Sequence, residues 1–118
     1  MNISWSEIKP YENELPTNYA DRIGRLYTDT VTAAFKKSNG QFFTPVSIAY
    51  FMGKQISVNK DSVSVLDPGC GTAILSCAMI ENLVLQSKVK QIELVTYETD
   101  ENLIPGLQKV LEYITIWG

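Results

Sequence analysis

The chain has no histidine, only two cysteines, and no apolar run that approaches the length of a membrane span. A zinc site usually needs histidine or a close cysteine pair, so no metal site is predicted. Cys70 and Cys77 lie seven positions apart, largely along one predicted helix. That spacing is roughly 10 Å of helix rise, beyond the ~7 Å reach of a disulfide. We expect both to be reduced, small apolar residues.

Positive charge is also scarce, because 10 Lys and Arg stand against 13 Asp and Glu, for a net charge of −3. A nucleic-acid-binding surface usually has a basic excess, so a polyanion partner would have to be held by residues outside this chain. The first residues lack a basic, apolar signal peptide, and no stretch offers the ~20 apolar residues of a membrane span. We therefore expect a cytoplasmic protein with no membrane contact.

The length of 118 residues suits one small domain. Residues 1–17 are mostly polar and predict an N-terminal arm, and residues 18–118 would form the domain. Apolar residues recur at helical spacing over about 18–37, which predicts a helix. Thr44-Pro45 predicts a second, short helix to about residue 56, with the hydroxyl as cap and proline at the first helical position.

The second half of the chain alternates between the two kinds of element. It predicts a strand over 63–67, a helix over 72–87 that is covered on most sides, a strand over 92–98 and a helix over 102–114. This order predicts an α/β fold: a parallel, right-handed βαβ unit preceded by N-terminal helices. Two parallel strands make a poor sheet on their own, because parallel sheets are normally covered on both faces. We expect part of a larger, Rossmann-like doubly wound domain, or a sheet completed against another chain.

The stretch VLDPGCGTAILSC turns sharply from the first strand into a helix. Such a turn can present backbone N–H groups and the positive end of a helix dipole to a ligand. Gly69 and Gly71 match only part of the dinucleotide pattern G-x-G-x-x-G, since Ile74 replaces its last glycine, and no P-loop Gly-Lys-Ser/Thr follows. A carboxylate at Asp67 would repel phosphate but attract a cation. The residues therefore favour S-adenosylmethionine, which carries a sulfonium and an ammonium and no phosphate.

The second strand ends in VTYETD, which places Glu98 at its carboxyl end, beside the end of the first strand. A carboxylate there can accept hydrogen bonds from both ribose hydroxyls. The simpler alternative is a solvated acid at the end of a strand. Asp100 is the second candidate, although it falls past the strand and could cap the next helix instead.

The segment VLDPGCGTA resembles the cofactor motif of adenine-specific DNA methyltransferases of restriction-modification systems, usually Asp-Pro-x-Cys-Gly-x-Gly. VTYETD is similar to the acidic second motif of that family, which implies a ribose-binding role for Glu98. Ala73 departs from the last glycine of the first motif, and we expect only a modest effect on packing. The resemblance assigns cofactor binding to Asp67, Pro68, Gly69, Cys70 and Gly71.

The segment GQFFTPVSIAYFM resembles the stretch that these enzymes place before the cofactor strand, typically Gly-Gln-Phe-Phe/Tyr-Thr-Pro. The resemblance implies that Thr44 contacts the methionine carboxylate of the cofactor, through its hydroxyl or its backbone N–H. The alternative is that Thr44-Pro45 only caps a helix and the aromatic rings only pack. The implied lining of the pocket is Gln41, Phe42, Phe43, Thr44 and Pro45.

The family's catalytic motif, Asn/Asp-Pro-Pro-Tyr/Phe, is not in this sequence, whose five prolines are all isolated. No catalytic residue is therefore assigned, and the resemblance implies the cofactor-binding portion of an enzyme, inactive alone, that meets DNA only through parts absent from this chain. A second copy or a partner subunit would cover the open sheet edge. Two alternatives stay open: a methyltransferase that acts on RNA or protein, and a non-catalytic cofactor-binding or assembly module.

Overall fold

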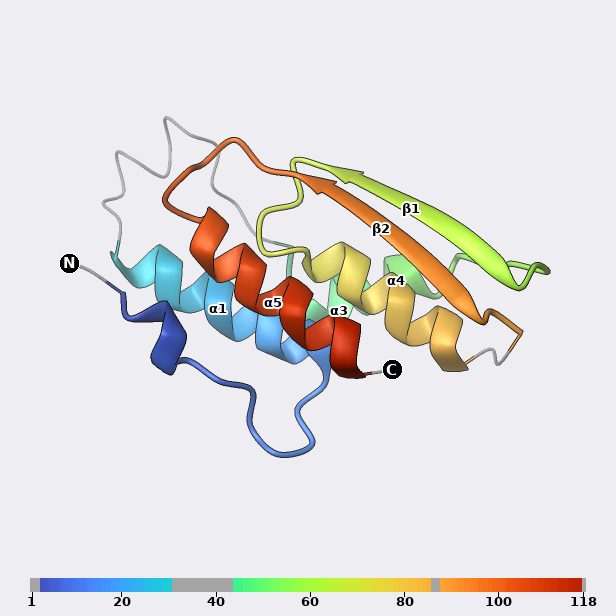
Figure 1. The fold of residues 1–118 in the computed structure, drawn as a ribbon, viewed down its shortest axis with the longest axis horizontal. Coiled ribbons are helices and arrows are strands. Elements are labelled where there is room, and N and C mark those ends of the chain that lie inside the picture. The colour runs from blue at the N-terminus through green and yellow to red at the C-terminus, as the bar shows by residue number, and fades with distance from the viewer. Residues whose placement is uncertain (1–2, 31–43, 86–87, 118) are drawn as a thin grey trace.

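The computed structural model describes residues 3–30, 44–85 and 88–117. Helices and strands alternate in the second half, as the sequence predicts (Figure 1). The elements are the 3-10 helix η1 (Trp5–Glu7), α1 (Pro16–Thr30), α3 (Val46–Gly53), β1 (Ser62–Pro68), α4 (Ile74–Leu85), β2 (Gln91–Tyr97) and α5 (Ile104–Trp117). None of the described helices is long and apolar enough to cross a membrane.

Strands β1 and β2 pair in parallel, which confirms the predicted α/β class and the parallel βαβ order. Val65 pairs with Leu94, and Pro68 pairs with Tyr97 at the carboxyl ends of both strands. Side chains alternate between the two faces of a strand. Val65 is 7% exposed, whereas its neighbour Leu66 is 65% exposed. Within the described residues, the helices therefore cover one face of the sheet and leave the other open.

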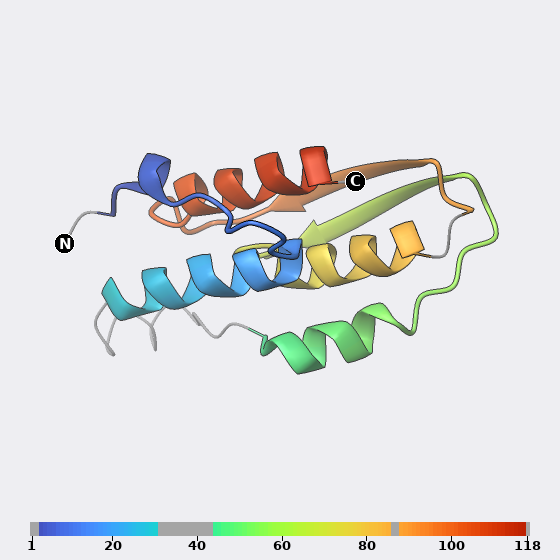
Figure 2. The same ribbon diagram turned by 90° about the horizontal axis from the view of Figure 1, so that it is seen from below.

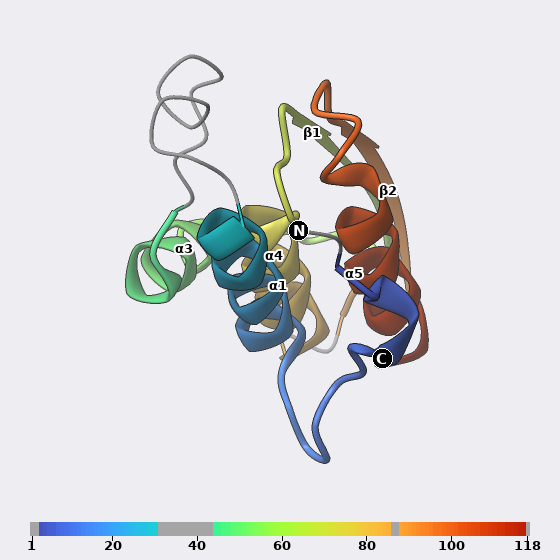
Figure 3. The same ribbon diagram turned by 90° about the vertical axis from the view of Figure 1, so that its left-hand side faces the viewer.

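Helix α4 lies at the centre of the helical layer, as its apolar sequence predicts. It packs against both α1 and α3, and α1 in turn packs against α5. Figures 2 and 3 show α3 on the outer side of α4, far from α5. The sequence prediction that this helix is covered on most sides is confirmed by its buried residues Ile74, Ser76, Cys77, Ala78, Ile80, Glu81 and Leu83.

A buried carboxylate, Glu81 of α4, ties three helices together. It is 4% exposed and accepts hydrogen bonds from the Thr17 backbone N–H at 2.8 Å, from the Thr17 hydroxyl, and from the Tyr50 hydroxyl at 2.8 Å. The first N–H groups of a helix have no partner within the helix, so Glu81 serves as a cap for α1 from another element. No local sequence pattern predicts this contact, because Thr17 and Glu81 are 64 positions apart.

The residues before α1 pack onto the helices. The Tyr19 hydroxyl donates to the Ile8 carbonyl at 2.7 Å. A Cβ on Gly106 of α5 would lie 2.9 Å from the Trp5 ring, so glycine allows the ring to sit close to the helix backbone. These contacts show that the segment packs against α1 and α5. They do not test the predicted boundary between arm and domain after residue 17, which stays a prediction.

The start of α3 differs from the prediction. Pro45, in an extended conformation with ψ of 149°, is the N-cap residue, and no side chain caps the helix. The Pro45 carbonyl accepts the Ala49 N–H at 2.9 Å, so helical hydrogen bonding begins one residue later than expected. The prediction that the Thr44 hydroxyl caps this helix is therefore wrong.

Candidate functional site

The turn between β1 and α4 contains three residues with positive φ at alternate positions. They are Gly69 at 64°, Gly71 at 58° and Ala73 at 64°. A residue with a Cβ is strained in this region and glycine is not. A Cβ on Gly69 would meet nothing within 4 Å, so the backbone conformation, and not crowding, requires glycine there. Ala73 has the same backbone conformation, although it carries a Cβ. The expectation that alanine in place of the last glycine of the motif affects only packing is therefore corrected, because it also affects backbone strain.

Three N–H groups of this turn are already bonded within the protein. The Cys70 N–H donates to the Tyr97 carbonyl at 2.9 Å, and the Gly71 N–H donates to Oε1 of Glu98 at 2.9 Å. The Ala73 N–H donates to the Cys70 carbonyl at 2.8 Å. The expectation that the turn offers its N–H groups to a ligand is wrong for these three. The first two fasten the turn to the end of β2, and the third closes the turn on itself, so these groups do not form an anion cradle.

Glu98 follows β2 directly, at the place that the sequence predicts. Its half-buried carboxylate bridges the two loops, because Oε1 accepts the Gly71 N–H and Oε2 accepts the Asp100 N–H at 2.8 Å. A carboxylate offers about four acceptor positions on its two oxygens. Glu98 can therefore keep both backbone donors and accept further hydroxyl groups.

Asp67 lies near the end of β1, on the face of the sheet that the helices cover. Its Oδ2 accepts the hydroxyl of Ser76, in the first turn of α4, at 2.5 Å. Burial, followed by the nearby Asp67 carboxylate, raises the pKa of the Cys70 thiol to about 11. Cys70 therefore stays a neutral thiol near pH 7, and its place is in the packing of the turn.

Asp100 orders the chain between β2 and α5. Its Oδ1 accepts the Asn102 N–H at 3.0 Å, and its carbonyl accepts the Leu103 N–H at 3.0 Å. Its other carboxylate oxygen accepts the hydroxyl of Tyr27, which lies on α1 and is 3% exposed. Burial, together with the hydrogen bond to Asp100, raises the pKa of Tyr27, so its hydroxyl keeps its proton. The Asp100 side chain thus orders the turn before α5, which begins at Ile104, and its role in ribose binding stays a prediction.

The structure brings together most of the predicted site residues, at the carboxyl ends of the two strands. These are Asp67, Pro68, Gly69, Cys70, Gly71, Glu98 and Asp100. Thr44 and Pro45 precede α3, and among the described residues no hydrogen bond joins them to this group. Gln41, Phe42 and Phe43 lie outside the described residues.

Two hydroxyl groups that the sequence did not predict donate hydrogen bonds to acids of this group, that of Ser76 to Asp67 and that of Tyr27 to Asp100. Ser76 stands out as a hydroxyl in an otherwise apolar helix segment, ILSCAMI, and this is a local sign of a polar contact. Tyr27 falls within the apolar helical pattern of residues 18–37, which indicates packing and gives no sign of a polar partner. Its partner Asp100 is 73 positions away, so no local pattern connects them.

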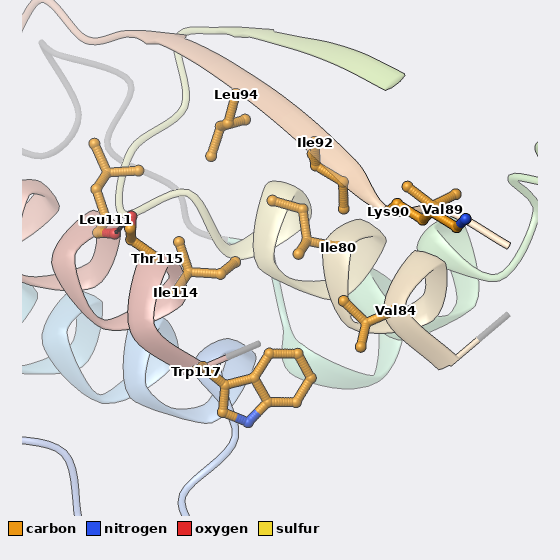
Figure 4. Close-up of a pocket in the computed structure, with 10 residues that line it drawn as sticks. All are labelled: Ile80, Val84, Val89, Lys90, Ile92, Leu94, Leu111, Ile114, Thr115 and Trp117. Carbon is orange, nitrogen blue, oxygen red and sulfur yellow. Dashed lines mark hydrogen bonds between the residues drawn. The ribbon is translucent and has the colours of Figure 1, made fainter. Parts of the chain in front are cut away.

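Two pockets lie apart from the strand ends. The larger, about 560 Å³, is a largely apolar groove between α4, β2 and α5, with side chains of all three elements around it (Figure 4). The other, about 390 Å³, lies beside Glu81 and Tyr50. Neither contains a predicted site residue. The larger groove is lined by Ile80, Val84, Val89, Lys90, Ile92, Leu94, Leu111, Ile114, Thr115 and Trp117.

Comparison with known proteins connects this geometry to a family. A model of the protein family described as N-6 DNA Methylase matches residues 19–105. The type II methyltransferase M.AccI of Acinetobacter calcoaceticus is 32% identical over 90 residues, which cover 76% of this chain and 16% of that protein. The type II methyltransferase M.BsuBI of Bacillus subtilis is 37% identical over 86 residues, which cover 69% of this chain and 17% of that protein.

The chain thus spans about a sixth of the length of these two relatives. No solved structure matches. The family match contains every described residue of the group at the strand ends, from Asp67 to Asp100. It confirms the resemblance that the motifs indicate, and the chain belongs to the N-6 DNA methylase family.

Proposed function

We propose that these 118 residues form the S-adenosylmethionine-binding portion of an adenine-specific DNA methyltransferase of a restriction-modification system. The main support is the pair of carboxylates, Asp67 and Glu98, at adjacent ends of two parallel strands. Such strand ends are where open α/β folds bind ligands. In this proposal the chain is the first part of a Rossmann-like domain, and residues 18–118 belong to that domain.

The donors and acceptors of the site suit this cofactor better than a nucleotide phosphate. The N–H groups of Cys70, Gly71 and Ala73 are used within the protein, whereas a phosphate site needs such donors free. Carboxylates favour hydroxyl groups and cations instead. Glu98 would accept the ribose hydroxyls, and Asp67 would attract the ammonium, directly or through water.

The remaining contacts of the cofactor are assigned by the motif alone. Thr44 would meet the methionine carboxylate, and its neighbours Gln41, Phe42, Phe43 and Pro45 would line the pocket. When bound, S-adenosylmethionine supplies the methyl group. The group that receives it, the amino group of adenine, would be held by residues outside this chain, as would the DNA. The chain alone is then expected to be inactive.

Calorimetric titration with S-adenosylmethionine tests the proposed binding. Glu98→Gln keeps the size of the side chain but loses its charge and one acceptor oxygen, and we expect affinity to fall about tenfold or more. Asp67→Asn should also weaken binding, because it removes the negative charge near the ammonium. Glu93→Gln is the matched control, since Glu93 lies exposed on β2 and faces away from the helices.

The two results that would contradict the proposal are distinct. Equal affinity in the parent chain, Glu98→Gln and Asp67→Asn would place the ligand elsewhere. Failure of a demonstrably folded chain to bind would mean that these residues do not form the cofactor site by themselves. Incubation of the pure chain with tritiated cofactor and adenine-containing duplex DNA tests the expected inactivity, and incorporation of label into adenine would contradict it.

A further inference from the structure

The hydroxyl of buried Tyr27, on α1, points at the loop that carries Glu98 and Asp100. We propose that Tyr27 is a positioning residue of the cofactor site, which sets the orientation of the Glu98 carboxylate through Asp100. The proposal rests on the proposed function, because it gives Tyr27 a role in holding the ribose of the same cofactor. Neither the motifs nor the comparisons assign a role to α1.

The hydrogen bonds form a continuous chain from α1 to the glycine turn. The Tyr27 hydroxyl donates to Oδ2 of Asp100, and the Asp100 N–H donates to Oε2 of Glu98 at 2.8 Å. Oε1 of Glu98 accepts the Gly71 N–H at 2.9 Å. A shift of Asp100 therefore moves the donor that holds one oxygen of Glu98.

Helix α1 is a firm support for this chain of bonds. Tyr27 is almost fully buried, and α1 packs against both α4 and α5, the helices that follow the two strands. A second bond ties the same helix to the turn, since the hydroxyl of buried Thr72 donates to the Ala20 carbonyl at 2.9 Å. Glu98 and Asp100 are half-buried parts of a connecting loop. The helix thus gives a rigid support to two acids that lie in a connecting loop.

Tyr27→Phe removes only the hydroxyl and keeps the ring in place. The matched control is Tyr19→Phe, because Tyr19 lies on the same helix, is also buried, and donates its hydroxyl to a carbonyl remote from the strand ends, that of Ile8. Both variants lose one hydrogen bond of a buried tyrosine. A general loss of stability should therefore affect them alike.

The first measurement needs no ligand. Amide hydrogen exchange of the 118-residue chain, followed by NMR, reports the protection of the Gly71 and Asp100 N–H groups. We expect Tyr27→Phe to lower protection at these two amides about tenfold relative to Tyr19→Phe, after scaling to the exchange of the α4 core. Equal protection in the two variants would overturn the proposal. A uniform loss of protection at all amides of the Tyr27→Phe variant would also overturn it.

The second measurement compares S-adenosylhomocysteine with its 2′,3′-dideoxy analogue, which lacks both ribose hydroxyls. Tyr27→Phe should weaken binding of the first ligand about tenfold and of the second less than about twofold, since Glu98 has no hydroxyl to hold in the analogue. In a Glu98→Gln background the effect of Tyr27→Phe should disappear, because coupled residues are not additive. Equal losses for the two ligands, or full additivity with Glu98→Gln, would refute the positioning role.

The two experiments separate this proposal from the proposed function. If the parent chain binds neither ligand while Tyr27→Phe loosens Gly71 and Asp100, the bond network is real and the cofactor assignment is wrong. If the parent chain binds and Tyr27→Phe changes neither exchange nor affinity, the cofactor assignment stands and the role of Tyr27 is wrong.

Discussion

Replacing Ala73 by glycine sets two effects against each other. Ala73 has a φ of 64°, and its methyl group is 0% exposed in the core. The left-handed conformation costs a residue with a Cβ about 1–2 kcal/mol, and glycine would relieve that strain. The substitution also removes a buried methyl group, which costs about 0.8 kcal/mol. Glycine further adds about 0.4–1 kcal/mol of unfolded-state entropy. The terms nearly cancel, so we expect the free energy of unfolding of Ala73→Gly to lie within about 0.8 kcal/mol of the parent value.

Ala78→Gly provides the matched comparison. Ala78 lies in the middle of α4 and is 1% exposed, so the variant loses a similarly buried methyl group, about 0.8 kcal/mol. Glycine in a helix interior costs about 1 kcal/mol more, and no strain is relieved there. Ala78→Gly should therefore be about 2 kcal/mol less stable than the parent, well separated from Ala73→Gly.

Urea denaturation of the parent and the two variants measures the difference, provided that the slopes agree. If Ala73→Gly is destabilised as much as Ala78→Gly, residue 73 carries no strain, and our account of the turn is refuted. If Ala73→Gly proves clearly more stable than the parent, strain outweighs the lost packing, and the methyl group contributes less than its burial indicates.

Other predictions follow from the buried polar groups and the strand pattern. Glu81→Gln should lower the free energy of unfolding by about 2–3 kcal/mol, because three donors converge on the carboxylate. Urea denaturation would measure this, and a loss no larger than that of a substitution on the protein surface would contradict it. Burial and the hydrogen bond to Glu81 raise the pKa of Tyr50 from 10.0 to about 12, so the stability that Tyr50 contributes is present below pH 10 and is lost as pH rises from 10 to 12. The stability difference between the parent and Tyr50→Phe should shrink over that range, and a difference independent of pH would show that Tyr50 does not titrate this way. Val65→Ser should lower the free energy of unfolding by about 2–3 kcal/mol and Leu66→Ser by less than about 1 kcal/mol, because adjacent strand positions face opposite sides of the sheet. Equal losses of stability in thermal unfolding would contradict this assignment of the buried and exposed faces. Cys70 should react with iodoacetamide at pH 8 far more slowly in the folded than in the urea-unfolded chain, as followed by mass spectrometry, and equal rates would show an exposed thiolate.

The sequence was sufficient to place the elements around the site, because the relevant signals are local. The β-rich segment before Asp67, the glycine turn and the strand that ends before Glu98 each lie within a few residues. Parallel pairing then follows from the βαβ order, and it brings the two acids to one end of the sheet. The predicted strands 63–67 and 92–98 differ from β1 and β2 by one residue at each end.

The errors and omissions concern contacts that no local pattern encodes. The turn N–H groups are used by the protein because Glu98 and the Tyr97 carbonyl, some 27 positions away, fold back onto them. Glu81 looks like a polar interruption of an apolar helix until Thr17, 64 positions earlier, is placed beside it. Ala73 gives no sign of its backbone conformation, since alanine is found mostly in helices.

The charges at the strand ends bear directly on the kind of ligand that fits. The carboxylates of Asp67, Glu98 and Asp100 are held by neutral donors, which are hydroxyl and backbone N–H groups. Neutral donors orient a carboxylate but leave its charge in place, whereas an ion pair would offset it. The ion pairs of the described residues lie elsewhere, for example between Arg22 and Glu14. Negative charges that have no ion-pair partner among the described residues, gathered at one end of a sheet, repel phosphate and attract a cation, by about 1 kcal/mol for each pair at close range even in water. The electrostatics of the turn therefore favour a cationic group over a phosphate, which is the charge pattern that the proposed cofactor would need.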